Sequence, residues 1–219
     1  MADRLTIYNG ALAHLEQRKL ASLAENREPK RVLDDIWDKE VAWCLERHFW
    51  NFSYRAVELV ASTSVTPTFG YLYAFPIPTD WIRTRKLSTS PTFDPPLLDY
   101  AEEAGYWYTN ISPIFVQYGS NDTAYGMDLG KWPATFASFV EFRLARMACK
   151  RITGSGDLLT GPEGLVKQEE KHRKVAAANC AMNEAVGFAP MSSWVRARRG
   201  FGTLVAPNGD EPSSSGLIP

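Results

Sequence analysis

The stretch Trp50-Asn51-Phe52-Ser53-Tyr54-Arg55-Ala56-Val57-Glu58-Leu59-Val60 marks the point where the sequence changes from helical to strand-like character. It is rich in aromatic and β-branched side chains, which is typical of a β-strand. Short runs broken by proline and glycine follow it and predict further strands at 71–75, 81–89, 97–101, 105–109 and 113–118. Their connections are too short for parallel crossovers, so we expect an antiparallel region. Asn110 and Ser112-Pro113 predict a hairpin between the last two strands.

Two helices are predicted before this region. Over residues 4–20 one helix face is formed by Leu5, Tyr8, Leu12 and Leu15, and Asp3 can cap that helix. A second helix from Pro29 to about residue 49 has an apolar stripe formed by Leu33, Ile36, Trp37, Val41, Cys44, Leu45 and His48. We expect the two helices to pack as a helical hairpin.

Two more helices are predicted after the strands. Helical spacing returns after Trp132-Pro133 and continues to about Ile152, where Gly154-Ser155-Gly156 suits a helix C-cap. Pro162 is expected to open the last helix and Gly187 to end it. Residues 188–219 contain too little apolar mass to fold alone, which predicts an extended tail.

Segregated helices and strands indicate the α+β class. The architecture predicted is a four-helix bundle with an inserted antiparallel β module and an extended C-terminal tail. The first helical pair is assigned to residues 1–49, the β module to 50–130, the second helical pair to 131–187 and the tail to 188–219.

Composition limits the function. Of the 219 residues 45% are hydrophobic and 22% are charged, so a packed core is possible. A net charge of -1 argues against a simple basic nucleic-acid binder. No apolar run is long enough to span a bilayer, and the N-terminus lacks the apolar region of a signal peptide. The cysteines, Cys44, Cys149 and Cys180, are expected to be buried reduced thiols of a protein made in the cytosol.

Charge is segregated along the chain. Between Leu87 and Gly130 there is no Lys or Arg, whereas residues 141–199 contain eleven Lys or Arg and six Asp or Glu. This pattern fits solvated faces, and it equally fits a self-complementary protein whose acidic part contacts a basic part of a neighbouring copy.

Few residues suggest catalysis or metal binding. Cys44 and His48 are four residues apart on one predicted helix face and could form a metal pair, although core packing explains them better. They support an alternative hypothesis, a small metal-dependent enzyme with a cleft between the bundle and the β module. The preferred hypothesis has no catalytic residue, no metal and no cofactor.

Aromatic residues are abundant in the β module. They suit either an interface or the module's own core, and the candidates are Tyr71, Tyr73, Trp81, Tyr106, Trp107 and Tyr108. In the tail, one aromatic residue stands beside three guanidinium groups, at Trp194, Arg196, Arg198 and Arg199. Such a segment suits a solubilising end, a region that orders on a partner protein, or a nucleic-acid-associated scaffold.

The segment Tyr71-Leu72-Tyr73-Ala74-Phe75-Pro76-Ile77-Pro78-Thr79-Asp80-Trp81-Ile82-Arg83 resembles one found in phage head-to-tail adaptors of the tail tubular protein A type. Further motifs similar to that family follow its order over residues 4–187; they are Asn9-Gly10-Ala11-Leu12, Trp50-Asn51-Phe52, Trp132-Pro133-x-x-Phe136 and Leu144-Ala145-x-x-Ala148-x-x-Ile152-Thr153-Gly154. Phe75 and Trp81 depart from the family pattern, and the tail does not align.

The resemblance implies a structural virion protein without enzymatic activity, made in the host cytoplasm and located at the head–tail junction. Such adaptors form a ring below the portal, usually of twelve copies. The ring extends the channel for double-stranded DNA and presents a docking surface to the next tail component, a nozzle, stopper or tail tube protein. No membrane is involved.

The resemblance also suggests roles for residues. The portal would be contacted by Trp194, Arg196, Arg198 and Arg199. The six aromatic residues of the β module would contact the tail side or a neighbouring subunit. The channel would be lined by Asp94, Asp99, Glu102 and Glu103, whose charge would let DNA pass without sequence-specific binding.

Overall fold

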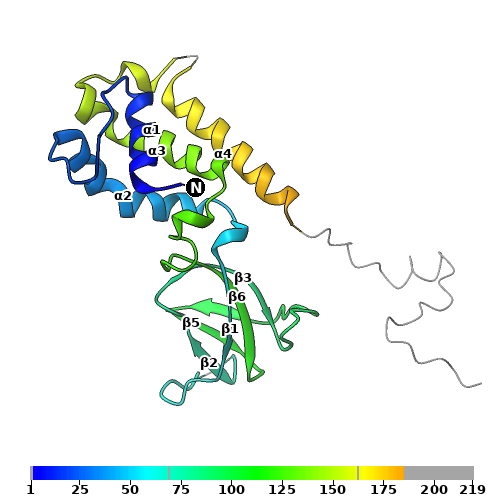
Figure 1. Cartoon of the computed structure of the whole chain (residues 1–219). Coiled ribbons are helices and arrows are strands. Elements are labelled where there is room, and N and C mark those ends of the chain that lie inside the picture. The colour runs from blue at the N-terminus through cyan, green and yellow to red at the C-terminus, as the bar shows by residue number, and fades with distance from the viewer. Residues whose placement is uncertain (1, 69, 162, 185–219) are drawn as a thin grey trace, which may run out of the picture. The chain divides into compact units, whose positions relative to one another are not determined.

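A computed structural model describes residues 2–68, 70–161 and 163–184. This part of the chain contains four α-helices and two small antiparallel sheets, so the fold is mixed α+β (Figure 1). The strands lie between the second and third helices in the sequence, as predicted. The predicted tail at 188–219 lies outside the described residues.

Helix α1 (Arg4–His14) begins where predicted, because the Asp3 carboxylate accepts a hydrogen bond of 2.7 Å from the backbone N–H of Thr6. The helix ends well before residue 20. Glu16 adopts a left-handed backbone with φ of 57°, and the Asn9 side chain exchanges two hydrogen bonds with the backbone of Leu20. These bonds hold the following loop against the helix, so its backbone is satisfied without further helical turns.

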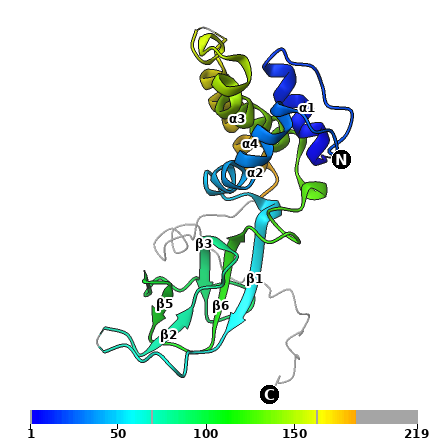
Figure 2. The same cartoon turned by 90° about the vertical axis from the view of Figure 1, so that its left-hand side faces the viewer.

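Helix α3 (Ala134–Thr153) lies at the centre of the helical part. Helices α1, α2 (Glu28–Glu46) and α4 (Leu165–Met182) all pack against it (Figure 2). Helices α1 and α2 also meet, as predicted, because Tyr8 packs edge to face on Trp37 and its hydroxyl donates to Asp34 at 2.8 Å. Each of the two helices nevertheless packs more extensively against α3 than against the other. Gly154 caps α3 in the left-handed region with φ of 71°, as its position predicted. Pro162 and Gly187 lie outside the described residues.

Aromatic rings fill much of the helical core. Trp50 and Phe136 meet edge to face with ring centroids 4.7 Å apart, and Phe136 meets Trp132 at 4.9 Å. Cys44 and Cys149 are also completely buried in this core. The three cysteines are free thiols, as expected.

Six strands form the two sheets. In the first sheet the order is β1 (Tyr54–Leu59), β6 (Ile114–Ser120) and β3 (Trp81–Ser88); in the second it is β2 (Tyr73–Pro76), β5 (Tyr106–Thr109) and β4 (Ala101–Glu103). Every pairing is antiparallel, as predicted. The predicted strand at 97–101 overlaps β4 only at Ala101, and the residues just before it form one isolated bridge, between Ser88 and Pro96.

The hairpin predicted between the last two strands is wrong. Strand β5 pairs with β2 and β4, whereas β6 pairs with β1 and β3, so residues 110–113 carry the chain from one sheet to the other. The reason lies in a second core that both sheets share, in which Phe75 and Trp107 pack with Leu87, Val116 and Tyr118. Changing sheets at the turn allows both strands to direct apolar side chains into that core.

Candidate interaction surfaces

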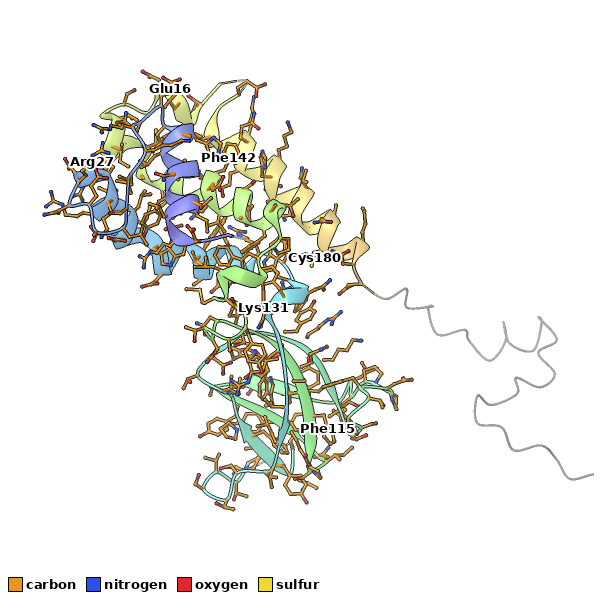
Figure 3. The ribbon with its side chains drawn as sticks, viewed as in Figure 1. Glu16, Arg27, Phe115, Lys131, Phe142 and Cys180 are labelled. Carbon is orange, nitrogen blue, oxygen red and sulfur yellow. The ribbon has the colours of Figure 1, made fainter. Side chains whose placement is uncertain are left out.

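Two of the sequence motifs quoted above, Trp50-Asn51-Phe52 and Trp132-Pro133-x-x-Phe136, lie where the strands join the helices. Cys180 lies near the end of α4 (Figure 3). Its carbonyl oxygen accepts a hydrogen bond of 2.8 Å from the Asn51 side chain, which fixes the entry to β1 against the end of α4. Trp50 donates to the carbonyl oxygen of Cys44, and Trp132 donates to that of Gly126. These motif residues therefore hold the two parts of the described unit together.

Asp80 ties the strands of the first sheet together. Its carboxylate accepts hydrogen bonds from Ser120, Tyr118 and Arg55, so one residue before β3 ties together β1 and β6. Burial alone would raise the pKa of Asp80, but the three hydrogen bonds hold that pKa below its usual value. Sequence analysis assigned no role to this residue beyond its place in the motif.

The second sheet has an outer face and an inner face. In the strand register, Phe75, Trp107 and Glu102 are opposite one another, so their side chains share the inner face. Tyr106 and Tyr108 alternate with Trp107 and lie on the outer face, with ring centroids 6.2 Å apart.

The inner-face residues are committed to the module itself. Trp107 is fully buried and donates from its indole N–H to Thr84 and Glu102, at 3.0 and 3.1 Å. Trp81 donates to the same Thr84 hydroxyl, which in turn donates to Glu102 at 2.6 Å. The expectation that Trp107 contacts another molecule is therefore corrected, since its ring is covered by its own module. Glu102 accepts two of these hydrogen bonds, so one of its carboxylate oxygens is used within the module.

The outer face forms a surface that we call the tyrosine–acid face, composed of Tyr71, Tyr106, Tyr108, Asp99 and Glu103. The Tyr71 hydroxyl donates to the Asp99 carboxylate at 3.2 Å. Partial desolvation and this carboxylate raise the pKa of Tyr71. A groove of about 350 Å³ lies beside them, lined by Tyr71, Tyr108, Ala101, Glu103 and residues 65–68 and 70.

Two predicted residues lie apart from this face. Asp94 is exposed in the loop between β3 and β4. Tyr73 shares a register pair with Thr109, which places it on the same side of the sheet as Trp107 rather than with Tyr108. Tyr73 is 39% exposed, so it is still accessible from solvent.

A second surface, which sequence analysis missed, lies on the helices. We call it the basic groove; it is lined by Trp43, Arg47, Arg143, Arg146 and Arg173, together with Val166, Glu169 and Glu170, and its volume is about 700 Å³. The Trp43 indole lies between two guanidinium groups, that of Arg143 at 3.6 Å and that of Arg47 at 3.9 Å from the ring centroid. Trp43 and Arg47 are four residues apart at the end of α2, and this spacing in the sequence could have predicted that the two side chains stack.

The proposed metal pair is not formed on one helix. Helix α2 ends at Glu46, so His48 lies beyond it and packs its ring against Trp50 at 5.0 Å. Cys44 is fully buried, and burial raises the pKa of its thiol. Among residues 2–184, apart from the undescribed 69 and 162, no three His, Cys, Asp or Glu side chains gather to hold a metal ion.

Trp194, Arg196, Arg198 and Arg199 lie outside the described residues. No helix in the described part is both long enough and apolar enough to cross a bilayer. Comparison with protein-family models gave no match, and comparison with curated proteins gave none either.

Proposed function

We propose that this chain is a structural virion protein, a head-to-tail adaptor that forms a ring below the portal. Such a ring would extend the channel for double-stranded DNA and present a docking surface to the next tail component. The helices would form a four-helix bundle at the ring wall, and the β module of residues 50–130 would face the tail.

The observation that carries the proposal is the separation of charge between two structured surfaces. The tyrosine–acid face lies on the second sheet and the basic groove lies on the helices, so one subunit offers two different, complementary surfaces. A ring needs such a pair, because each subunit contacts one neighbour with one surface and the next neighbour with the other. The resemblance to adaptors supports the same proposal, and two of its motifs, Trp50-Asn51-Phe52 and Trp132-Pro133-x-x-Phe136, lie at the junction of the strands and the helices.

Two further roles belong to the proposal. Asp94 and Glu102, which lie outside the tyrosine–acid face, would face the channel, where carboxylates let DNA pass because they do not attract its phosphates. Residues 188–219 would dock on the portal, with Trp194 as an anchor and Arg196, Arg198 and Arg199 pairing with its carboxylates.

Particle imaging tests the proposal. Purified virions are imaged with this chain carrying a small label, and the label should form a ring between the capsid vertex and the tail. Absence of the chain from purified virions would refute the proposal.

A truncation tests the role of the C-terminal segment. Deleting residues 188–219 should leave the melting temperature of residues 1–187 nearly unchanged and abolish joining to the portal. Replacing the same residues by a Gly/Ser linker of equal length is the matched control, which should fail to join as well. Full particle assembly by either variant would contradict the proposed portal contact.

A further inference from the structure

We infer that the basic groove on the helices binds the tyrosine–acid face of a second copy of this chain. The inference rests on the proposed function, because it names the contact through which neighbouring subunits of the ring would meet. The partner is thus a protein surface carrying carboxylates and tyrosine rings.

The basic groove holds one more cation than its carboxylates neutralise. Arg143 is buried and pairs with Glu40 at 2.6 Å and with Glu169 at 3.4 Å. Arg146 pairs with the same Glu169 at 2.9 Å, and Arg173 pairs with Glu170 at 2.7 Å. These ion pairs therefore set three carboxylates against three guanidinium groups.

Arg47 is the remaining guanidinium. It is exposed and stacks on Trp43, and none of the ion pairs among the described residues includes it. Stacking holds the guanidinium in place and leaves its N–H donors free to bind a carboxylate from outside. Arg143 on the other side of the ring keeps the indole itself fixed. The groove is thus preorganised around one unpaired positive charge.

The tyrosine–acid face carries carboxylates that no positive charge on the face neutralises. Residues 56–82 and 87–130 contain no Lys or Arg, and these ranges include all three strands of the second sheet. Asp99 and Glu103 take part in none of the ion pairs among the described residues. The neighbouring tyrosine rings offer further contacts to guanidinium groups.

The two surfaces cannot meet within one chain. In both views the helices that line the groove lie on one side of the junction and the second sheet lies on the other (Figures 1 and 2). The contact must therefore join two copies, and it is heterologous because different surfaces take part. Repeating it closes a ring or runs on as a filament, depending on the rotation between copies.

Cysteine cross-linking tests the contact in the full chain. Arg47→Cys and Glu103→Cys variants are mixed and oxidised, and the native cysteines, Cys44, Cys149 and Cys180, are buried and should stay unreactive. The mixture should give a cross-linked dimer in at least about tenfold higher yield than either variant alone. Arg31→Cys, on the exposed surface of the same helix, replaces Arg47→Cys in the matched control. Equal yields from the test and control mixtures overturn the inference.

Charge reversal provides a second test. Arg47→Glu and Glu103→Arg should each weaken self-association, measured by sedimentation, by about tenfold, and the double variant should recover most of the loss. Failure of the double variant to recover overturns the inference. If Arg47→Glu instead lowers binding of double-stranded DNA and leaves self-association unchanged, the groove binds phosphates, which also overturns it.

These outcomes separate the inference from the proposed function. Labelled rings at the head–tail junction without the 47–103 cross-link would overturn the inference alone. A specific 47–103 cross-link in a chain that is absent from virions would support the self-contact and refute the adaptor role.

Discussion

Gly10 of α1 lies against the carboxyl group of Glu141 of α3. A Cβ at residue 10 would collide with that carboxyl group, so glycine leaves the space that the Glu141 carboxyl group occupies. The Glu141 side chain is largely buried, and its carboxylate lies 3.9 Å from His14 Nε2. One residue of the Asn9-Gly10-Ala11-Leu12 motif therefore has a definite steric function.

Gly10→Ala should test this function in two backgrounds. Alanine favours a helix interior over glycine by about 1 kcal/mol, so the change should stabilise the protein by that amount once the Glu141 side chain is shortened in Glu141→Ala. With Glu141 present, the displaced carboxyl group should cancel that gain and cost about 1 kcal/mol instead. Urea melts of the four proteins measure the coupling. A stabilising Gly10→Ala in the natural background would contradict the steric reading.

Stability should fall as the pH rises through neutrality. Burial raises the pKa of Glu141 to about 7, above its ordinary value of 4.5, so the folded protein binds a proton that the unfolded chain releases. The stability from this proton is complete below pH 4.5 and lost as the pH passes 7. His14, His48 and His172 have lowered pKa values, so the slope due to Glu141 is measured as the difference from a variant that keeps all three histidines.

Glu141→Gln measures that slope. Between pH 5 and 7.5 the natural protein should lose about 1–2 kcal/mol of unfolding free energy relative to the variant, since partial solvent exposure weakens the effect of the shift. The difference should be constant above about pH 8, where the variant should be the more stable protein. Parallel profiles for the two proteins would assign the pH dependence to another group.

Trp37→Ala should cost about 3–5 kcal/mol, because a large ring is removed from a packed core. Trp37 is 4% exposed, and its ring packs edge to face on Tyr8 at 5.4 Å and parallel to Trp132 at 6.3 Å. Trp43→Ala on the same helix is the matched control and should cost about 1–2 kcal/mol, because Trp43 is only half-buried. Equal costs in denaturant melts would mean that the core does not depend on Trp37.

Local patterns in the sequence predicted the elements better than their pairing. Helical spacing and proline or glycine breaks placed α2, α3 and most strands to within a few residues, because these signals act within a few residues of the chain. The early end of α1 escaped prediction, since it depends on a side-chain bridge from Asn9 to Leu20. The pairing of β5 with β2 and β4 was not predicted either, because a turn in the sequence indicates that the chain reverses but does not specify which strand the next segment pairs with.

Local patterns could indicate which residues of one strand share a face, but they could not indicate which distant residues form one surface. Alternation along Tyr106, Trp107 and Tyr108 places Trp107 on the opposite face from its neighbours, and this signal could have excluded it from the interface. The basic groove unites Arg47 with Arg143, which are far apart in the sequence, so only the packing of α2 on α3 brings them together.

Asp80→Asn should cost about 2–3 kcal/mol, because hydrogen bonds to a charged acceptor are among the stronger ones in proteins. The carboxylate joins three groups from β1 and β6, and asparagine keeps its shape while it removes the charge that Arg55 pairs with at 3.0 Å. Urea melts at pH 7 measure the loss. Asp94→Asn, at an exposed position, is the matched control and should be nearly neutral.

The same variant should change the response to acid. The pKa of Asp80 lies below its ordinary value in the folded protein, so its stabilisation is present above about pH 4 and lost as the pH falls through the folded value. The difference in unfolding free energy between the natural protein and Asp80→Asn should therefore be constant from pH 5 to 7 and shrink below pH 4. A difference that persists unchanged at pH 2.5 would show that the lost stability comes from packing in the first sheet and not from the charge of Asp80.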